Sequence, residues 1–196
     1  HSLMRISLRD VGLDDLAIFF EHQQDRDATR MAAFPSRDWH DFLAHWHQKI
    51  LANAHGKKQT IVVDDGVAGN ILSWEQDGRR LVGYWLGRLY WGRGVATAAL
   101  AKFLEHEETR PLYAYVAAHN AGSIRVLEKN GFLRVELEHM SGTDEVEELC
   151  FGSKQDITDL RRSRATTTNI HRRQPSFANA LRSPVSRSAP RLRNSM

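Results

Sequence analysis

The segment from Tyr84 to Leu104 constrains the fold of this chain more than any other, because it predicts a strand, a glycine-rich turn and a helix in succession. An apolar run that ends near Leu89 is typical of a buried strand, and the apolar residues from Val95 to Leu104 have helical spacing. The turn between them reads Trp91-Gly92-Arg93-Gly94. Two glycines one residue apart let successive backbone N–H groups approach one anion, and the start of the helix adds its unpaired amides. The segment therefore predicts a phosphate-binding loop.

The remaining patterns predict an α/β (α+β) fold with a mixed, mostly antiparallel seven-stranded sheet and four helices, in the order β-α-α-β-β-β-α-β-α-β-β. Strands are predicted at residues 4–8, 58–64, 67–75, 80–89, 112–117, 132–139 and 144–151, and helices at about 12–24, 38–50, 95–110 and 120–130. Asp65-Gly66 and Asp77-Gly78 are two-residue hairpin signals. Because a helix separates the fourth strand from the fifth, these two are expected to be parallel.

Less regular segments complete the prediction. Residues 25–35 are predicted to be a loop, and the last two strands are expected to turn at Ser141-Gly142-Thr143. The fourth helix is expected to close at Asn130-Gly131, and the third to continue to Thr109-Arg110, where Pro111 stops it.

At 196 residues and 41% hydrophobic composition, the chain can form one sizeable core. We expect one domain at residues 4–152, preceded by a vector-derived scar at 1–3 and followed by a disordered tail at 153–196. The tail carries ten Lys or Arg against two Asp, whereas residues 1–152 carry 17 basic and 22 acidic side chains. An acidic domain suits an amine-bearing substrate, and an ordinary solvated surface explains the same balance.

Other features limit the classes of protein and site. No stretch approaches the roughly 20 apolar residues that a membrane span requires, and no signal segment opens the chain, so we expect a cytoplasmic protein with no membrane partner. Cys150 is the single cysteine, which excludes an intrachain disulfide, and its apolar neighbours favour a buried thiol. His40, His45 and His47 lack the same-face spacing of helical metal ligands, so we expect no metal.

Two sequence blocks resemble a known superfamily. The first is the loop from Trp91 to Ala96, and the second runs from Asn120 through Ser123 to the Glu128–Phe132 stretch EKNGF. With the order of elements, they resemble the GNAT acyl-CoA N-acyltransferase superfamily, and most closely its branch related to ribosomal-protein N-terminal acetyltransferases. The resemblance covers residues 4–152. It implies that acetyl-CoA lies in a V-shaped gap where the fourth and fifth strands part.

The resemblance also implies a set of cofactor-binding residues. The diphosphate is expected at the glycine loop and the start of its helix, namely Gly92, Arg93, Gly94, Val95, Ala96 and Thr97. The acyl and pantetheine groups are expected beside Trp85, Leu86 and Gly87, and the pantetheine arm beside Asn120 and Ser123. A backbone amide of the fourth strand is expected to stabilise the oxyanion that develops when an amine attacks the thioester.

The catalytic residues are less well defined. Many family members carry a tyrosine that protonates the departing thiolate, and Leu127 stands at that position. Ser123, one helical turn earlier, is our candidate donor, with a role in the first helical turn as the alternative. Glu75 and His119, each at the end of a strand, are candidate bases, although Glu75 also fits a solvated hairpin position and some members use water chains. Many relatives also have a glutamate where this chain has Ala98.

The leading hypothesis is an N-acetyltransferase that moves an acetyl group from acetyl-CoA to a primary amine, on a small molecule or a protein N-terminus, by direct attack. We expect residues 25–39, with Trp74, Tyr84 and Trp85, to select the amine. The alternative is an acyl-CoA-binding module without turnover, favoured by the leucine at position 127. A nucleic-acid partner of the basic tail has less support, and the final hairpin is suited to pairing in a homodimer.

Overall fold

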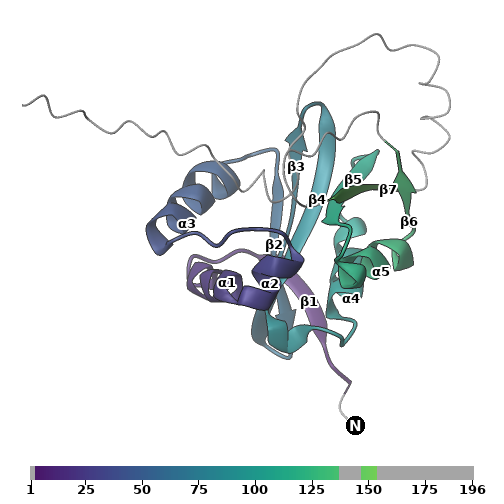
Figure 1. Cartoon of the computed structure of the whole chain (residues 1–196). Helices are drawn as coiled ribbons and strands as arrows, with labels where there is room; N and C mark the ends of the chain where they lie inside the picture. The colour runs from purple at the N-terminus through teal and green to yellow at the C-terminus, as the bar shows by residue number, and fades with distance from the viewer. Residues whose placement is uncertain (1–2, 137–146, 154–196) are drawn as a thin grey trace, which may run out of the picture.

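The computed structural model describes residues 3–136 and 147–153, and it contains a seven-stranded sheet in the order β1-β2-β3-β4-β5-β7-β6 (Figure 1). The strands are β1 (Ile6–Asp10), β2 (Lys57–Val63), β3 (Gly66–Gln76), β4 (Arg79–Leu86), β5 (Leu112–Ala117), β6 (Phe132–Val135) and β7 (Glu148–Ser153). The helices are α1 (Asp15–Gln24), α2 (Arg26–Met31), α3 (Trp39–His45), α4 (Val95–Leu104) and α5 (Ala121–Lys129). A π-helical turn, η1 (Trp46–Leu51), continues α3, and a 3-10 turn, η2 (Arg88–Tyr90), follows β4. The predicted fold class and mostly antiparallel sheet are confirmed.

The pairing of the strands follows the predicted order. All neighbours are antiparallel except β4 and β5, which are parallel as the intervening helix requires. The β3–β4 hairpin turns at Asp77-Gly78, where both residues have positive φ. The β2–β3 hairpin turns at Asp64-Asp65 instead of Asp65-Gly66, because Gly66 already pairs with Val63.

Helices cover both faces of the sheet (Figure 1). On one face, α1 and α3 bury Phe19 and Phe42 against Leu72 of β3, and α2 lies over Trp85 of β4. On the other face, α4 and α5 cover β4 and β5 in the largest apolar cluster, which includes Val82, Val95 and Leu127 among its buried members. Successive residues of β4 therefore point to opposite layers.

Several expected boundaries were wrong. Residues 25–35 contain α2, because the Asp25 carboxylate caps a short helix by accepting hydrogen bonds from the amides of Asp27 and Ala28. Helix α4 ends at Leu104 and not near Arg110. The chain turns there and buries the Glu107 carboxylate against Ser73 and Arg80 of the sheet.

Another wrong boundary is the end of β4, which stops at Leu86 and not at Leu89. The Trp91 indole folds back and donates a hydrogen bond to the Leu86 carbonyl (3.1 Å), so the chain leaves the sheet in a 3-10 turn. The first strand also lies two residues later than expected, with Ile6 opposite Val63.

Some expectations lie outside the described residues. These are the turn at Ser141-Gly142-Thr143, most of the scar at 1–3, and the tail at 153–196 apart from Ser153, which ends β7. Within residues 3–136 and 147–153, no helix has the length and apolarity needed to cross a bilayer.

Candidate functional site

The sheet opens between β4 and β5. These strands pair only at Arg80 with Leu112 and at Leu81 with Tyr113. Beyond that point β4 continues to pair with β3 as far as Leu86, and β5 continues to pair with β7 as far as Ala117. Residues 82–86 and 114–117 therefore face each other across a gap in the sheet, at the place where the family resemblance implies that the two strands part.

The orientation of the backbone at the end of β4 follows from one hydrogen bond. The Gly87 amide donates to the Ala68 carbonyl on β3 (2.9 Å). Because the amides of successive strand residues point to opposite sides, the Leu86 amide points away from β3 and toward the gap. The backbone thus directs a donor into the opening at Leu86, one of the residues that the family resemblance places beside the acyl group.

The glycine loop next to the gap has the conformation that an anion site needs. Gly92 and Gly94 have φ values of +68° and +77°, which side chains rarely adopt, and no atom lies within 4 Å of an added Cβ on either. Gly94 is the N-cap of α4 and no side chain caps this end of the helix. The exposed loop and the uncapped amides of Val95 and the next two residues fit a diphosphate.

Contacts on both sides hold this loop in place. The Asn130 side chain at the end of α5 donates to the Thr97 carbonyl in the first turn of α4 (3.2 Å). Arg88, which precedes the loop, forms ion pairs with Asp25 and Asp27 at the start of α2. The Arg93 side chain is exposed, Val95 is buried in the core, and Ala96 is half-buried.

The second block lies on the other side of the gap. Asn120 caps α5, and its carboxamide oxygen accepts a hydrogen bond from the Ser123 amide (3.1 Å). The Tyr84 hydroxyl on β4 donates to Ser123 Oγ (3.0 Å), so a side-chain bridge joins β4 to α5. Burial raises the pKa of Tyr84 to about 12, against the smaller effect of the Ser123 hydrogen bond. Leu127 packs in the core and presents no polar atom.

The two candidate bases lie at different places. His119 follows β5 at the open end of the gap, and one ring nitrogen, Nε2, lies 2.9 Å from the Arg30 carbonyl of α2. Glu75 lies on β3 opposite Arg80 of β4. Arg80 precedes Leu86 by six residues on the same strand, so Glu75 lies about 20 Å along the sheet from Leu86. That separation argues against Glu75 as a base for an amine at the gap, and its carboxylate lies 4.0 Å from Arg80 Nη1.

Sequence reasoning missed two features of the site. The first is the Tyr84–Ser123 bridge, which joins residues 39 positions apart. The second is His22 on α1, whose ring lies so close to Gly87 that an added Cβ would come within 2.5 Å of Nε2. The pKa of His22 is lowered by burial, and its Nδ1 is buried without a hydrogen-bond partner in the structure. The alternation along β4 could have assigned Tyr84 to the face of α5, whereas nothing local marks His22.

Trp85 lies on the opposite face from Tyr84. Its indole donates to the His22 carbonyl (3.2 Å), and its ring contacts Phe34 edge-on at a centroid distance of 5.7 Å. The Arg37 guanidinium lies 5.5 Å from the centre of the Phe34 ring. An aromatic wall therefore borders β4 on the side of α2.

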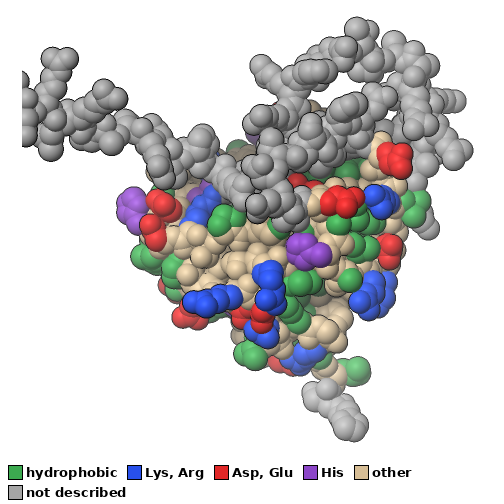
Figure 2. Space-filling view, in the orientation of Figure 1, with side chains coloured by type: hydrophobic (Ala, Val, Ile, Leu, Met, Phe, Trp, Pro, Cys, Tyr) green, Lys and Arg blue, Asp and Glu red, His purple; other side chains and the backbone are tan. Residues whose placement is uncertain are grey.

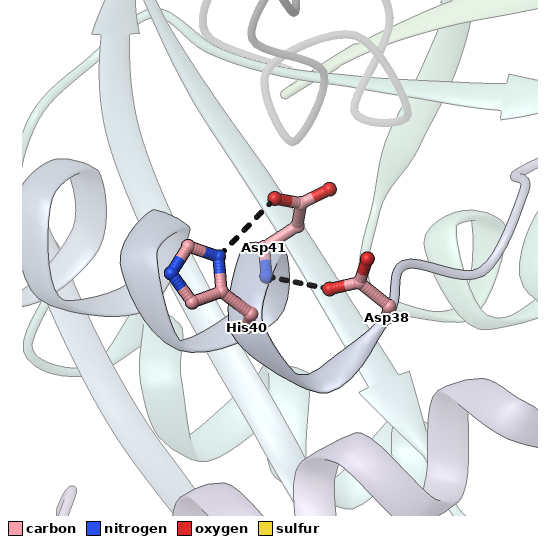
Figure 3. A group of neighbouring side chains, drawn as sticks. All are labelled: Asp38, His40 and Asp41. Carbon is pink, nitrogen blue, oxygen red and sulfur yellow. Dashed lines mark hydrogen bonds and ion pairs between the residues drawn. The ribbon is translucent and has the colours of Figure 1, made fainter.

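A group of possible metal ligands occurs at the start of α3, where Asp38, His40 and Asp41 lie close together (Figure 3). All three side chains are exposed. The Asp38 carboxylate already caps the helix by accepting from the Asp41 amide (2.8 Å), and His40 Nδ1 lies 3.7 Å from the Asp41 carboxylate. The capping of α3 by Asp38 and the contact between His40 and Asp41 explain why the three side chains lie together, without a metal ion.

The charges of the described surface are mixed. In Figure 2, basic and acidic side chains alternate over the face shown, with hydrophobic groups between them. Where the described residues are visible on that face, their acidic side chains form no extended patch.

Comparisons with known proteins agree with this geometry. A family model described as acetyltransferase (GNAT) domain matches residues 5–133. The uncharacterized N-acetyltransferase p20 of Bacillus licheniformis is 27% identical in an alignment of 147 positions that covers 66% of this chain and 83% of that protein.

Solved structures share the fold. A GNAT family acetyltransferase from Bacillus anthracis has a TM-score of 0.62 at 18% identity, over 76% of this chain and 93% of that one. Spermidine N-acetyltransferase from Vibrio cholerae, in complex with CoA and spermine, has a TM-score of 0.62 at 14% identity, over 78% and 98% of the two chains.

Proposed function

The chain belongs to the GNAT acetyltransferase family, and from that premise we propose that it transfers the acetyl group of acetyl-CoA to a primary amine by direct attack. An acetyl-transferring enzyme follows from the family itself. Our proposal goes beyond the family in three respects: the acetyl donor, the class of acceptor, and the residues that act on them.

The observation that carries the proposal is the gap between β4 and β5 beside an uncapped helix. The strands share two residue pairs and then part, and α4 begins at Gly94 immediately after β4 and its turn. A cofactor with an anionic end and a thioester end matches this order: Gly92, Gly94 and the first turn of α4 would hold the diphosphate. Trp85, Leu86, Gly87 and Asn120 would line the rest of the cofactor.

The acyl end would lie at the backbone of β4. There the Leu86 amide points into the gap, where it is suited to stabilise negative charge on the thioester oxygen. Ser123 lies on α5, across the gap from β4, and its hydroxyl would face the sulfur of the thioester. Leu127 cannot take that part, because it is an apolar core residue.

His119 is our candidate base. A carbonyl has no hydrogen to donate, so the contact with the Arg30 carbonyl requires a proton on Nε2. In the neutral imidazole, Nδ1 then carries the lone pair and is able to accept a proton from an attacking amine, directly or through a water. The position of His119 at the open end of the gap supports this role over Glu75.

The acceptor would approach from the side of α2. Phe34 and Trp85 form an aromatic wall there, which suits an amine carried by an apolar or planar group or by a peptide N-terminus. The Vibrio cholerae relative acts on spermidine by its name, and a polyamine is therefore one member of the test panel.

The diphosphate assignment is tested with Gly94→Leu. The new side chain would stand over the uncapped amides, so we expect the affinity for acetyl-CoA to fall at least about 100-fold, measured by calorimetry. Gly78→Leu is the matched control, because Gly78 also has a positive φ (+73°) and open space around an added Cβ, at the far β3–β4 turn. Equal binding by both variants would contradict the assignment.

Turnover is tested by the release of free thiol from acetyl-CoA with a panel of peptides, polyamines and aromatic amines. We expect release with at least one amine at a rate well above hydrolysis. Tight binding of acetyl-CoA without release on any of these amines would favour a binding module over the enzyme.

A further inference from the structure

The hydroxyl bridge across the gap carries an inference that rests on the proposed function. Tyr84 and Ser123 come from the two sides of the opening, β4 and α5, and their oxygen atoms lie 3.0 Å apart. The Ser123 backbone is fixed in turn, because its amide donates to the Asn120 cap. The hydroxyl of Ser123 is therefore held from two directions.

Tyr84 is the donor in this pair. A phenol is a stronger acid than an aliphatic alcohol, so the shared hydrogen belongs to Tyr84 and Ser123 Oγ accepts it. Burial raises the pKa of Tyr84 to about 12, which keeps the phenol protonated at any physiological pH. Among the hydrogen bonds of the described residues, none has Ser123 Oγ as its donor. The hydrogen of Ser123 thus remains available for a group in the gap.

The Tyr84–Ser123 bridge lies close to the proposed thioester site. Tyr84 stands two residues before Leu86, whose amide faces the gap, so the bridge and the proposed thioester site share one short stretch of β4. Tyr84 and Leu86 also point to the same face of the sheet, the face that α5 covers.

We propose that Tyr84 is a positioning residue, which holds the Ser123 hydroxyl so that its hydrogen points at the sulfur of the bound cofactor. In the reaction, a C–N bond forms between the amine and the acyl carbon, the C–S bond breaks, and its electron pair stays on sulfur. Ser123 keeps its proton and donates a hydrogen bond to the developing negative charge. The proton of the amine leaves through the base, and the sulfur takes a proton from solvent.

The proposal predicts a preference for the thiolate form of CoA that needs no acceptor to measure. The test compares the affinities of CoA and desulfo-CoA between pH 6.5 and 9.5 by calorimetry, since a free thiol titrates at about pH 8.5. In the unmodified protein, the affinity for CoA relative to desulfo-CoA should rise with pH. In Tyr84→Phe most of this rise should be lost, about tenfold at the alkaline end.

Ser123→Ala should lose the rise to the same extent, and the double variant should lose no more than either single variant. Tyr113→Phe is the matched control, because it removes the hydroxyl of a buried tyrosine on β5 in a separate cluster with Leu81 and Cys150. Two titratable or charged side chains at the start of α5, His119 and Arg125, bind the carbonyls of Arg30 and Ala121, and neither of these contacts involves Tyr84.

The possible outcomes distinguish a failure of the proposed function from a failure of the role of Tyr84. If the unmodified protein binds neither CoA nor desulfo-CoA, the proposed function fails and this inference fails with it. If both ligands bind and Tyr84→Phe keeps the full rise with pH, only the role of Tyr84 is refuted. With an identified amine, Tyr84→Phe should lower kcat and leave the KM for acetyl-CoA unchanged, whereas a change in KM alone would indicate a packing role.

Discussion

The imidazole of His119 shows how a single contact fixes the chemistry of a residue. A carbonyl can only accept, so the contact with Arg30 requires that the proton of the neutral ring is on Nε2. The contact also joins the end of β5 to α2. The proposed base, His119, is therefore held against the helix that borders the proposed amine site.

His119→Gln separates these two roles. The glutamine amide is able to donate to the Arg30 carbonyl as Nε2 does, but it cannot accept a proton at neutral pH. We expect kcat/KM for the amine to fall about 100-fold, with the affinity for acetyl-CoA unchanged. Steady-state kinetics with an identified amine measure both quantities, and a kcat/KM equal to that of the unmodified enzyme would exclude His119 as the base.

Among the elements, the short helix α2 depends on its first residue. The Asp25 carboxylate accepts from the amides of Asp27 and Ala28 and also lies 3.7 Å from Arg88, which precedes the glycine loop. A helix of six residues has little stability of its own, so its cap and its contacts hold it. Helix α2 therefore connects the loop, the aromatic wall and His119.

Asp25→Ala should lower the free energy of unfolding, because the N-cap is lost, and urea unfolding would measure the change. Because α2 then frays, the KM for the amine should rise as well. Asp25→Asn keeps a capping oxygen and should retain most of the stability. Equal losses in the Ala and Asn variants would mean that the charge, and not the cap, holds α2.

The elements also show what a sequence can and cannot predict here. The start of the helix at Val95 and the strand from Leu112 to Ala117 were predicted correctly, because glycine and apolar spacing are local signals. The end of α4 was missed because Glu107 is buried by partners on β3 and β4, Ser73 and Arg80. The bridge from Tyr84 to Ser123 was missed for the same reason, since its geometry depends on how distant elements pack.

For the molecule as a whole, two buried carboxylates make stability depend on pH. Hydrogen bonds from Arg9, and also from Thr60 and the Gly12 amide, lower the pKa of Asp15 to about 2. Burial alone would raise the pKa of Glu107, but hydrogen bonds from Ser73, Thr109 and Arg80 outweigh it and lower this pKa to about 2 as well. Asp15 joins α1 to β1 and β2, and Glu107 joins the end of α4 to β3 and β4.

Each group contributes stability above the pKa of about 4 that an unfolded carboxylate has, and loses it as the pH falls toward 2. The contribution is on the order of 2 kcal/mol for each carboxylate. We expect the free energy of unfolding to decline between pH 5 and 3. In Asp15→Asn it should be lower at pH 7 and decline less over that range. A decline as steep as in the unmodified protein would show that Asp15 does not drive it.

The parting of β4 from β5 also bears on how the chain assembles. Residues 6–86 supply β1 to β4, and residues 112–153 supply β5 to β7, so each side of the opening is made from one continuous stretch. During synthesis the first stretch is able to complete its hairpins before β5 leaves the ribosome. We expect the two pairs at Arg80–Leu112 and Leu81–Tyr113 to form late, as a seam between two locally folded halves. The opening then follows from the order of the chain, since neither half needs the other to complete its own ladder.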